Sequence, residues 1–487
     1  MDYDFIVIGS GYGGLSAAAM LVKNGFKILV LESHSQIGGC ASFYKRKDFI
    51  FDVGATTFSG IKFNQPVGIL FNELGIVPNL LKIDPGIIIN LDQTTINRYS
   101  DKDKWIEEAS SHFGIKNQSK FWNQIYSIDK LAWELVGSNY KLPPRSIGDF
   151  ISFLDLKNIK YSKLIKPLFS SVESYIKKYN FRSSLFYKFL EEQLLITTQS
   201  GINEAPFLTA SMGLAYPSET YYPIGGMYKP AKQLSDFIEA NSTEIKFKQK
   251  VTSIKETNSG YTIETAKGNK YQSKGIISNI PIWNMAKITE NSIQKYFMKY
   301  SKKFDSSWGA FTLNFAVETK TDLKSVYYQL HSDNKIPYCN SNSIFVSFSE
   351  KDDREKAPEG FRTVTISTHT DVNNWGNISK EEYEKRKSVT SKAILEIFDN
   401  FFKKIGIDKL FLLSGTPNTF EFYTQRDKGF VGGIPHSIKK NLLFMPPNVT
   451  PFKNLYMVGD TVFPGQGTPA VILGGLNVVK RILDKRN

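Results

Sequence analysis

The chain has few cysteines and few histidines. Of its 487 residues, only Cys40 and Cys339 are cysteines and five are histidines. Two thiols cannot build a framework of several disulfides or a four-thiolate cluster, and histidines scattered singly do not suggest a dedicated zinc site. We therefore expect neither a disulfide scaffold nor a metal centre. Cys40 is expected to be a small packing residue rather than a reactive thiol.

Long apolar runs and the features of a secretory leader are also lacking. No stretch approaches the roughly 18 uninterrupted apolar residues of a membrane-spanning helix, and the best candidate, residues 469–479, contains two glycines and an asparagine. The N-terminus, Met-Asp-Tyr-Asp, has no basic segment ahead of an apolar one. We therefore expect a cytosolic protein without a signal peptide or a transmembrane segment.

The charge is unbalanced but nowhere concentrated. The 61 Lys and Arg residues exceed the 47 Asp and Glu residues, giving a net charge of +14, which suits an anionic membrane surface, an acidic substrate or nucleic acid. No nucleic-acid-binding motif and no dense basic block is found, so we expect no nucleic acid. Aromatic residues make up 14% of the chain, which suggests a large apolar cavity or an interfacial surface, or only a compositional bias.

The N-terminal segment has the pattern of a dinucleotide-binding unit. Residues 4–8 form an apolar run that predicts a buried parallel strand, and Gly9-Ser10-Gly11-Tyr12-Gly13-Gly14 follows at once. A helix is predicted over residues 15–23 and a second strand over 27–31, ended by Glu32. Strand, glycines, helix, strand and terminal acid in this order are a specific signal.

Each part of this motif has a physical reason. Gly9 permits the turn out of the strand, Gly11 lets the backbone approach a pyrophosphate, and Gly14 allows the helix to pack closely on the sheet. The phosphates would lie at the positive end of the helix, over free backbone N–H groups. Glu32 can accept hydrogen bonds from both ribose hydroxyls, which disfavours a 2′-phosphate and hence NADP. Alone, the motif does not separate NAD from FAD.

Two further segments point to the same site. Gly38-Gly39 follows the second strand, in a turn whose backbone N–H groups could face a pyrophosphate. Near the C-terminus, residues 455–458 predict a strand that ends in Gly459-Asp460, and a buried helix is predicted from Ala470 to about Leu483 after a turn containing Gly467. A carboxylate at that strand end can accept a hydrogen bond from a ribityl hydroxyl, and the helix N-terminus can stabilise negative charge on a reduced flavin.

The middle of the chain adds a β-meander. Residues 245–255, 261–266 and 270–278 read as three strands separated by turn signals. This resembles the insertion of flavin oxidoreductases, in which the position of Val251 contacts adenine through its backbone; an ordinary hairpin is the alternative.

Taken from end to end, the sequence resembles the carotenoid and retinoid branch of the FAD oxidoreductases. The similarity rests on the glycine motif with Glu32 and on four further segments, which are Phe51–Ala55, Tyr222–Gly226, Arg426–His436 and Gly459–Pro469. The last of these is similar to carotenoid isomerases and the related 3′,4′-desaturases.

This resemblance implies an α/β fold, with a two-dinucleotide-binding (Rossmann-like) FAD domain and an interleaved α+β substrate domain. The FAD domain would comprise residues 1–62, 224–282 and 415–487, and the substrate and membrane-facing domain residues 63–223 and 283–414. The implied cofactor is noncovalent FAD and the implied substrate a lipophilic polyene taken from a membrane. Desaturation, cis–trans isomerisation and saturation share this scaffold, and the motifs do not choose among them.

Catalytic residues are harder to predict, because a polyene offers nothing ionisable to grip and catalysis would depend on positioning and on the flavin. Arg426, Asp427 and His436 lie in a glycine-rich segment expected near the flavin. They are candidates for charge stabilisation, and His436 for a general base, but a salt bridge that holds the loop is the simpler interpretation.

Residues 145–200 interleave nine basic and five acidic residues with aromatic and aliphatic ones. Such helices could lie on an anionic bilayer with lysine side chains reaching the headgroups, or could be an ordinary solvated face. Peripheral membrane association is therefore a hypothesis.

Several other functions remain open at this point. They are a flavin amine oxidase of the same superfamily, a polyene saturase, a lipid-escort protein of the same architecture without FAD, and an NAD-dependent dehydrogenase. The intact glycine motifs at both ends of the chain argue against the escort protein, and the C-terminal element would have no role in an NAD-only enzyme.

Overall fold

The computed structural model describes residues 2–144, 147–153, 156–403, 405 and 408–486. Its first sheet has seven strands in the spatial order β10-β11-β12-β1-β2-β9, with β18 also paired to β12. The bounds are β1 (Tyr3–Ile8), β2 (Ile28–Leu31), β9 (Glu244–Lys246), β10 (Val251–Thr257), β11 (Gly260–Thr265), β12 (Lys270–Ser278) and β18 (Leu455–Met457). Strands β18, β12, β1, β2 and β9 are parallel, whereas β10 and β11 form an antiparallel meander with β12.

Both faces of the parallel strands are buried, which explains their continuous apolar sequences. In β1, Phe5 and Val7 pack with the helices α1 (Tyr12–Lys23), α10 (Tyr228–Ala240) and α15 (Thr468–Asp484). Ile6 and Ile8 belong to a second cluster with Trp283. Alternate residues thus point to opposite sides.

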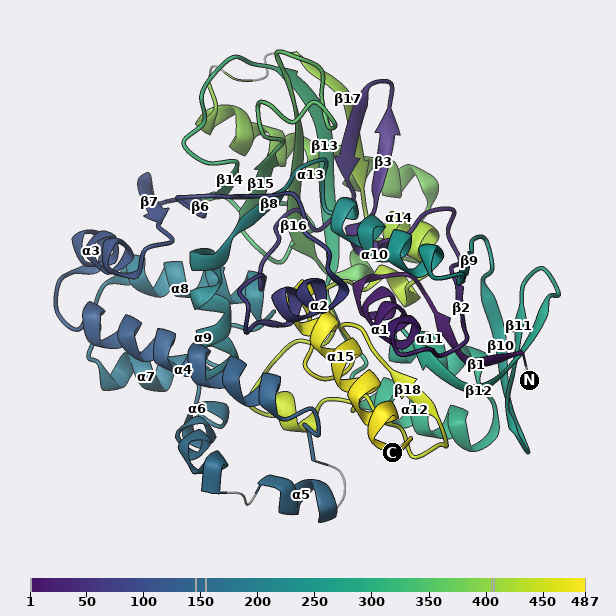
Figure 1. Ribbon diagram of the computed structural model, residues 1–487. Helices are drawn as coiled ribbons and strands as arrows, with labels where there is room; N and C mark the ends of the chain where they lie inside the picture. The colour runs from purple at the N-terminus through teal and green to yellow at the C-terminus, as the bar shows by residue number, and fades with distance from the viewer. Residues whose placement is uncertain (1, 145–146, 154–155, 404, 406–407, 487) are drawn as a thin grey trace.

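A second seven-stranded sheet lies at the top of Figure 1, in the order β17-β13-β16-β15-β14-β6-β7. Its strands are β6 (Ile87–Leu91), β7 (Thr94–Arg98), β13 (Gly309–Glu318), β14 (Tyr327–His331), β15 (Ser343–Phe348), β16 (Phe361–Thr370) and β17 (Lys409–Gly415). It is antiparallel except for the pair β6–β14. Two small ribbons pair β3 (Phe43–Arg46) with β4 (Phe49–Asp52) and β5 (Leu80–Lys82) with β8 (Tyr221–Pro223).

Helices cover the sheets and build a separate layer. Figure 1 shows α3–α9 at the left and bottom, and α15 beside α1 and α2 near the centre. The bounds are α1 (Tyr12–Lys23), α2 (Pro66–Leu74), α3 (Lys102–Phe113), α4 (Gln118–Ser138), α5 (Ile147–Phe153), α6 (Ile165–Leu168), α7 (Val172–Lys178), α8 (Ser184–Thr197), α9 (Phe207–Ala215), α10 (Tyr228–Ala240), α11 (Ile282–Ile288), α12 (Asn291–Lys303), α13 (Lys380–Phe401), α14 (Pro417–Thr424) and α15 (Thr468–Asp484). Within the described ranges, no helix has the length and apolarity needed to cross a membrane.

The predicted α/β class is confirmed, and so are the β-α-β unit, the meander and the C-terminal strand and helix. The prediction of one continuous strand over residues 245–255 was wrong. The run 245–255 is two strands, because the backbone turns at Lys248, whose φ is 55°. β9 pairs with β2 at one edge of the first sheet, whereas β10 pairs with β11 at the opposite edge, in the meander. The domain boundaries given above stay a prediction.

Candidate functional site

The carboxyl ends of the parallel strands meet at one edge of the first sheet, where ligands of open α/β sheets bind. Gly9 follows β1, and its φ of 92° requires a glycine. A Cβ on Gly14 would lie 2.2 Å from the Gly9 carbonyl oxygen, so this glycine is fixed by packing. A Cβ on Gly11 would lie 2.7 Å from Nδ2 of Asn279, the residue that follows β12. The glycine loop is therefore a narrow cradle with an amide side chain beside it.

Glu32 is held firmly at the end of β2. One carboxylate oxygen accepts from the backbone N–H of Ser10 at 2.8 Å and from its hydroxyl at 2.6 Å. The other accepts from the N–H of His34 at 2.7 Å and from the hydroxyl of Ser33 at 3.1 Å. Glu32 is buried, and these donors fix its carboxylate where the ribose of a dinucleotide is expected.

The second glycine pair lies against the first glycine loop. Gly38 donates its N–H to the carbonyl of Ser10 at 2.9 Å, and a Cβ on Gly39 would lie 3.8 Å from Cα of Gly11. Both glycines have positive φ. Burial raises the pKa of the neighbouring Cys40 thiol, which agrees with a packing residue rather than a nucleophile.

Val251 lies close to the same edge. Gln249, two residues earlier, donates its N–H to the carbonyl of Glu32 at 2.8 Å, and Lys248 donates to the carbonyl of His34 at 3.0 Å. The buried Val251 thus begins β10 directly beside the expected ribose position. Its contact with adenine stays a prediction.

The C-terminal element completes the cradle. Gly459, with φ 102°, follows β18 by two residues, and its N–H nitrogen would lie 3.1 Å from a Cβ on Gly13. Gly467, with φ 92°, is the N-cap of α15, whose first turn has no acidic residue. The two helices α1 and α15 touch at Gly13 and Gly475, where a Cβ on Gly475 would lie 2.9 Å from the Gly13 carbonyl oxygen. A Cβ on Gly13 would also lie 3.3 Å from the carbonyl oxygen of Val471, in the first turn of α15. The first turns of the two helices, neither of which has a side-chain cap, therefore lie next to each other, which suits a ligand with a pyrophosphate and a second electron-rich group.

Asp460 and the two charged catalytic candidates form ion pairs. Nη2 of Arg426 donates to both carboxylate oxygens of Asp460, at 3.0 and 2.8 Å. Burial opposes the charge on Arg426, but the Asp460 carboxylate prevails and raises the pKa of the guanidinium. Asp427 pairs instead with Lys287 of α11. Arg426 thus orients the carboxylate predicted to meet the ribityl chain, whereas Asp427 anchors the loop.

His436 is buried and neutral. Desolvation lowers the pKa of its imidazole to about 4, its backbone N–H donates to the carbonyl of Thr198 at 2.9 Å, and its Nε2 has no hydrogen-bond partner. A Cβ on Gly465 would lie 2.7 Å from that Nε2. His436 therefore packs on the loop before α15, and its role as a base stays a prediction.

Two of the segments that carry the family resemblance, Phe51–Ala55 and Tyr222–Gly226, lie against each other. Asp52, from Phe51–Ala55, accepts from the N–H of Met227 at 3.0 Å, just before α10, and pairs with the buried Lys356. A Cβ on Gly226 would lie 2.7 Å from the Asp52 carboxylate. Asp52 thus holds the end of β4 to the start of α10.

Sequence reasoning missed three side chains at this site, namely Asn279, Gln199 and Gln466. Asn279 lies beside the glycine loop because it directly follows β12, which pairs with β1. The two glutamines are 267 positions apart in the sequence and form a hydrogen bond of 3.2 Å. No local sequence pattern predicts such a contact.

One group could hold a metal ion outside this edge. Ligand atoms of Asp92, His331 and Asp333 lie within 4.8 Å of one another at one end of the second sheet. Nζ of Lys188 already donates to both oxygens of Asp92, at 2.9 and 2.7 Å. The ammonium group of Lys188 therefore already neutralises the charge of the Asp92 carboxylate.

The sequence profile of a family described as "Flavin containing amine oxidoreductase" matches residues 12–483. The chain belongs to this family. FAD is accordingly its cofactor, and the cradle, the held Glu32 carboxylate and the two uncapped helix N-termini fit that cofactor. When bound, FAD supplies the redox chemistry; Arg426 orients Asp460, and the glycine loops would receive the pyrophosphate.

Curated relatives span nearly the whole chain. Prolycopene isomerase from Daucus carota is 28% identical over 99% of this chain and 80% of its own length. All-trans-retinol 13,14-reductase from Danio rerio is 24% identical over 98% and 86%, and 1-hydroxycarotenoid 3,4-desaturase from Flavobacterium sp. is 22% identical over 96% of each.

Among solved structures, putrescine oxidase superposes with a TM-score of 0.66 at 13% identity, covering 99% of both chains. An oxidoreductase from Methanosarcina mazei superposes with a TM-score of 0.62 at 19% identity, also covering 99% of both. At these identities, the superpositions show a shared fold.

Proposed function

We propose that this flavoenzyme acts on a lipophilic polyene of the carotenoid type, by cis–trans isomerisation or by desaturation. The curated relatives named above act on carotenoids or on a retinoid, and four prolycopene isomerases are 27–28% identical to this chain. Isomerisation is therefore expected ahead of desaturation, for which the relative is 22% identical.

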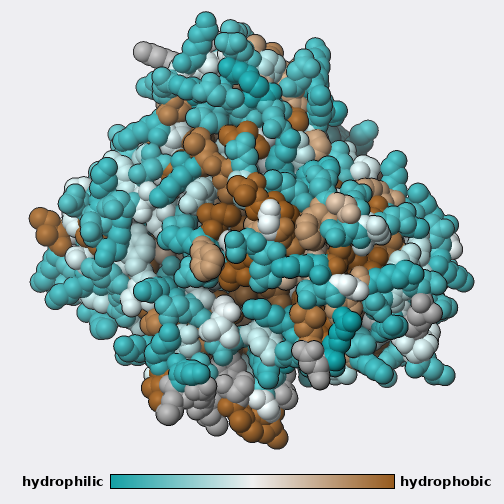
Figure 2. All heavy atoms as spheres, in the orientation of Figure 1, coloured by the Kyte–Doolittle hydropathy of each residue, from teal (hydrophilic) through white to brown (hydrophobic). Residues whose placement is uncertain are grey.

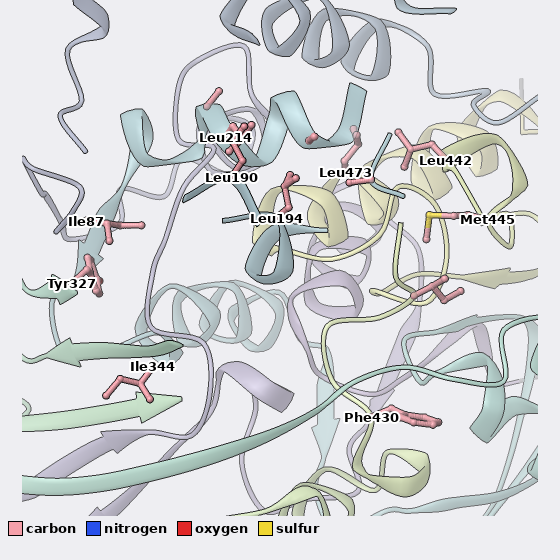
Figure 3. Close-up of a cluster of buried hydrophobic side chains, with 14 of the residues drawn as sticks. Ile87, Leu190, Leu194, Leu214, Tyr327, Ile344, Phe430, Leu442, Met445 and Leu473 are labelled. Atoms are coloured by element: carbon pink, nitrogen blue, oxygen red, sulfur yellow. The ribbon is translucent and has the colours of Figure 1, made fainter. Parts of the chain in front are cut away.

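One observation carries the proposal. Buried apolar side chains run from the loop and helix of the flavin side to the second sheet (Figure 3). Leu473 of α15, Met445, Leu442 and Phe430 lie at one side of the view. At the other side lie Ile87, Leu190, Leu214, Tyr327 and Ile344, and Leu194 lies between the two groups.

The chemistry of these side chains suits a hydrocarbon. None of the labelled ones carries a formal charge at neutral pH, and burial raises the pKa of Tyr327 further above its usual value. Tyr327 donates its hydroxyl to the carbonyl of Thr56 at 2.7 Å. An extended polyene would be held by apolar contact and positioned against the flavin, without a residue that grips an ionised group.

The test is a pigment profile. The protein would be expressed in strains that accumulate phytoene, poly-cis-lycopene, all-trans-lycopene or a hydroxylated carotene, and pigments would be resolved by chromatography with absorption spectra. A shifted retention time at unchanged mass indicates isomerisation, and a longer chromophore indicates desaturation. A shorter chromophore would indicate saturation instead. Unchanged pigments in every strain, with FAD bound, would refute the proposal, and peroxide release from amines would then be measured.

We also propose that the enzyme meets its substrate at a membrane surface. The segment from α5 to α6, at the bottom of Figure 1, exposes five large apolar side chains, and brown atoms lie at the same place in Figure 2. They are Ile147, Ile151, Ile159, Ile165 and Phe169, which are 47 to 81% exposed. Lysines alternate with them at positions 157, 160, 163 and 166. Of the charged residues counted in 145–200, Arg145 and Asp155 lie outside the described residues.

Exposed apolar side chains flanked by lysines favour an anionic bilayer. Flotation with vesicles of anionic lipid should recover the protein, and Ile147→Asp with Ile151→Asp should reduce recovery. Ile115→Asp is the matched control, because Ile115 is 85% exposed on another part of the surface. Equal loss in both variants, or no flotation of the unaltered protein, would contradict membrane association. Cytosolic location stays a prediction.

A further inference from the structure

Gln199 lies at the junction between the helical layer and the flavin side. It follows α8 by two residues, is only 3% exposed and has a φ of 56°. Its Nε2 donates to the carbonyl of Gly432 at 2.7 Å and to Oε1 of Gln466 at 3.2 Å. Its own Oε1 is buried and has no hydrogen-bond partner.

The orientation of this amide follows from its neighbours. Gln466 donates its Nε2 to the carbonyl of Thr197, so its Oε1 must face Gln199. Three acceptors, this Oε1 and the carbonyls of Val431 and Gly432, then require the nitrogen of Gln199 on their side. Oε1 of Gln199 is therefore a fixed acceptor that lacks a donor, and a buried acceptor of this kind is unfavourable unless a donor is supplied.

The position of the acceptor indicates what the donor could be. Gln466 directly precedes Gly467, the N-cap of α15, so Gln199 is one hydrogen bond from the helix end expected beside the C2 carbonyl of the flavin. Gly433, next to Gly432, packs on Asp460, since a Cβ there would lie 2.1 Å from the Asp460 carbonyl oxygen. The loop held by Gln199 thus lies on the residue expected to meet the ribityl chain.

We propose that Oε1 of Gln199 accepts a hydrogen bond from N3–H of the FAD isoalloxazine ring. In the oxidised ring N3–H is the single N–H donor, and it adjoins the C2 carbonyl. The same side chain thereby joins three parts of the protein to the cofactor: the end of α8, the Gly432 loop and the loop before α15. Gln199 would be a flavin-binding residue that the glycine motifs do not include.

The test compares FAD with its N3-methyl analogue, which lacks the donor. Apoprotein would be titrated with each cofactor and the dissociation constants measured by flavin fluorescence. For the unaltered protein, we expect the analogue to bind at least tenfold more weakly. In Gln199→Ala both cofactors should bind with affinities equal within about threefold, because the acceptor is gone.

Gln466→Ala is the matched control. It removes the hydrogen bond between Gln199 and Gln466 but keeps Oε1 of Gln199. The protein should therefore still bind FAD more tightly than the analogue. If Gln199→Ala does not fold, Gln199→Asn, whose amide is withdrawn by one methylene, replaces it. Equal affinity of the unaltered protein for both cofactors overturns the proposal, and so does an undiminished preference in the Gln199 variant. The measurement uses no polyene, so its failure leaves the proposed substrate untouched.

Discussion

Helix α1 packs against the middle of α15 at Gly475, and Gly475→Ala tests this contact. A Cβ on Gly475 would lie 2.2 Å from Oγ of Ser16, 2.9 Å from the carbonyl oxygen of Gly13 and 3.1 Å from the N–H nitrogen of Ala17. Ser16 cannot simply turn aside, because its hydroxyl donates to the Gly13 carbonyl at 2.9 Å. The other two contacts are backbone, so the helices must separate.

The size of the effect follows from a comparison with the adjacent glycine. A Cβ on Gly474 would meet Nδ2 of Asn448 at 3.3 Å and the carbonyl oxygen of Phe463 at 3.5 Å, which needs only a slight adjustment. Replacing glycine by alanine in a helix is intrinsically favourable by up to about 1 kcal/mol, and this term is common to both variants. The difference between their free energies of unfolding therefore reports only the overpacking at Gly475. We expect Gly475→Ala to be less stable than Gly474→Ala by about 1–3 kcal/mol.

Two measurements on purified protein check this. Thermal unfolding of both apoproteins should show a lower midpoint for Gly475→Ala than for Gly474→Ala. Fluorescence titration should show weaker FAD binding by the first variant, because both helix N-termini face the expected pyrophosphate and flavin; each tenfold loss is about 1.4 kcal/mol. A Gly475→Ala protein as stable as Gly474→Ala, with the same FAD affinity, would refute the close contact.

Three further outcomes are expected. Lys356→Met should lower the free energy of unfolding by about 3–5 kcal/mol in a denaturant titration, because it leaves the buried Asp52 carboxylate without its cation. Lys229→Met is the control, since Lys229 is 37% exposed in its pair with Glu355, and it should cost below about 1 kcal/mol. Equal losses in both variants would contradict this prediction. Burial lowers the pKa of His369 and of His436 to about 4, below the unfolded value of about 6.5. Stability should therefore fall as pH drops from about 6.5 to 4, by up to about 1.4 kcal/mol per pH unit for each histidine, and His436→Gln should flatten this slope; an unchanged slope would show that the imidazole is not buried neutral. Glu32→Gln should weaken FAD binding at least about tenfold in fluorescence titration, since a carboxamide has one acceptor oxygen for the donors that now hold two; unchanged affinity would place the adenosine elsewhere.

The β-α-β unit could be predicted because its determinants are local. An apolar run, a glycine turn and a helical stretch ended by Asn24-Gly25 follow one another within 31 residues, and the structure gives β1, α1 and β2 at these positions. The buried C-terminal helix was predictable for the same reason, since its apolar residues continue to Lys480. The meander was predicted from its turns, but its first strand was drawn too long. Nothing in the sequence near Lys248 marks the point where the chain changes its pairing from β2 to β11.

The sequence by itself determined the cofactor class and the places where the backbone must bend, because glycine turns and strand–helix periodicity act between neighbouring residues. Only the tertiary structure decided which side chains meet there. Arg426 reaches Asp460 over 34 positions, and Gln199 reaches Gln466 over 267. Asn279 comes to lie beside Gly11 because β12 pairs with β1. Such contacts follow from the order of strands in the sheet and from the packing of α8 against distant loops, and residues so far apart in the chain carry no local pattern that reveals them.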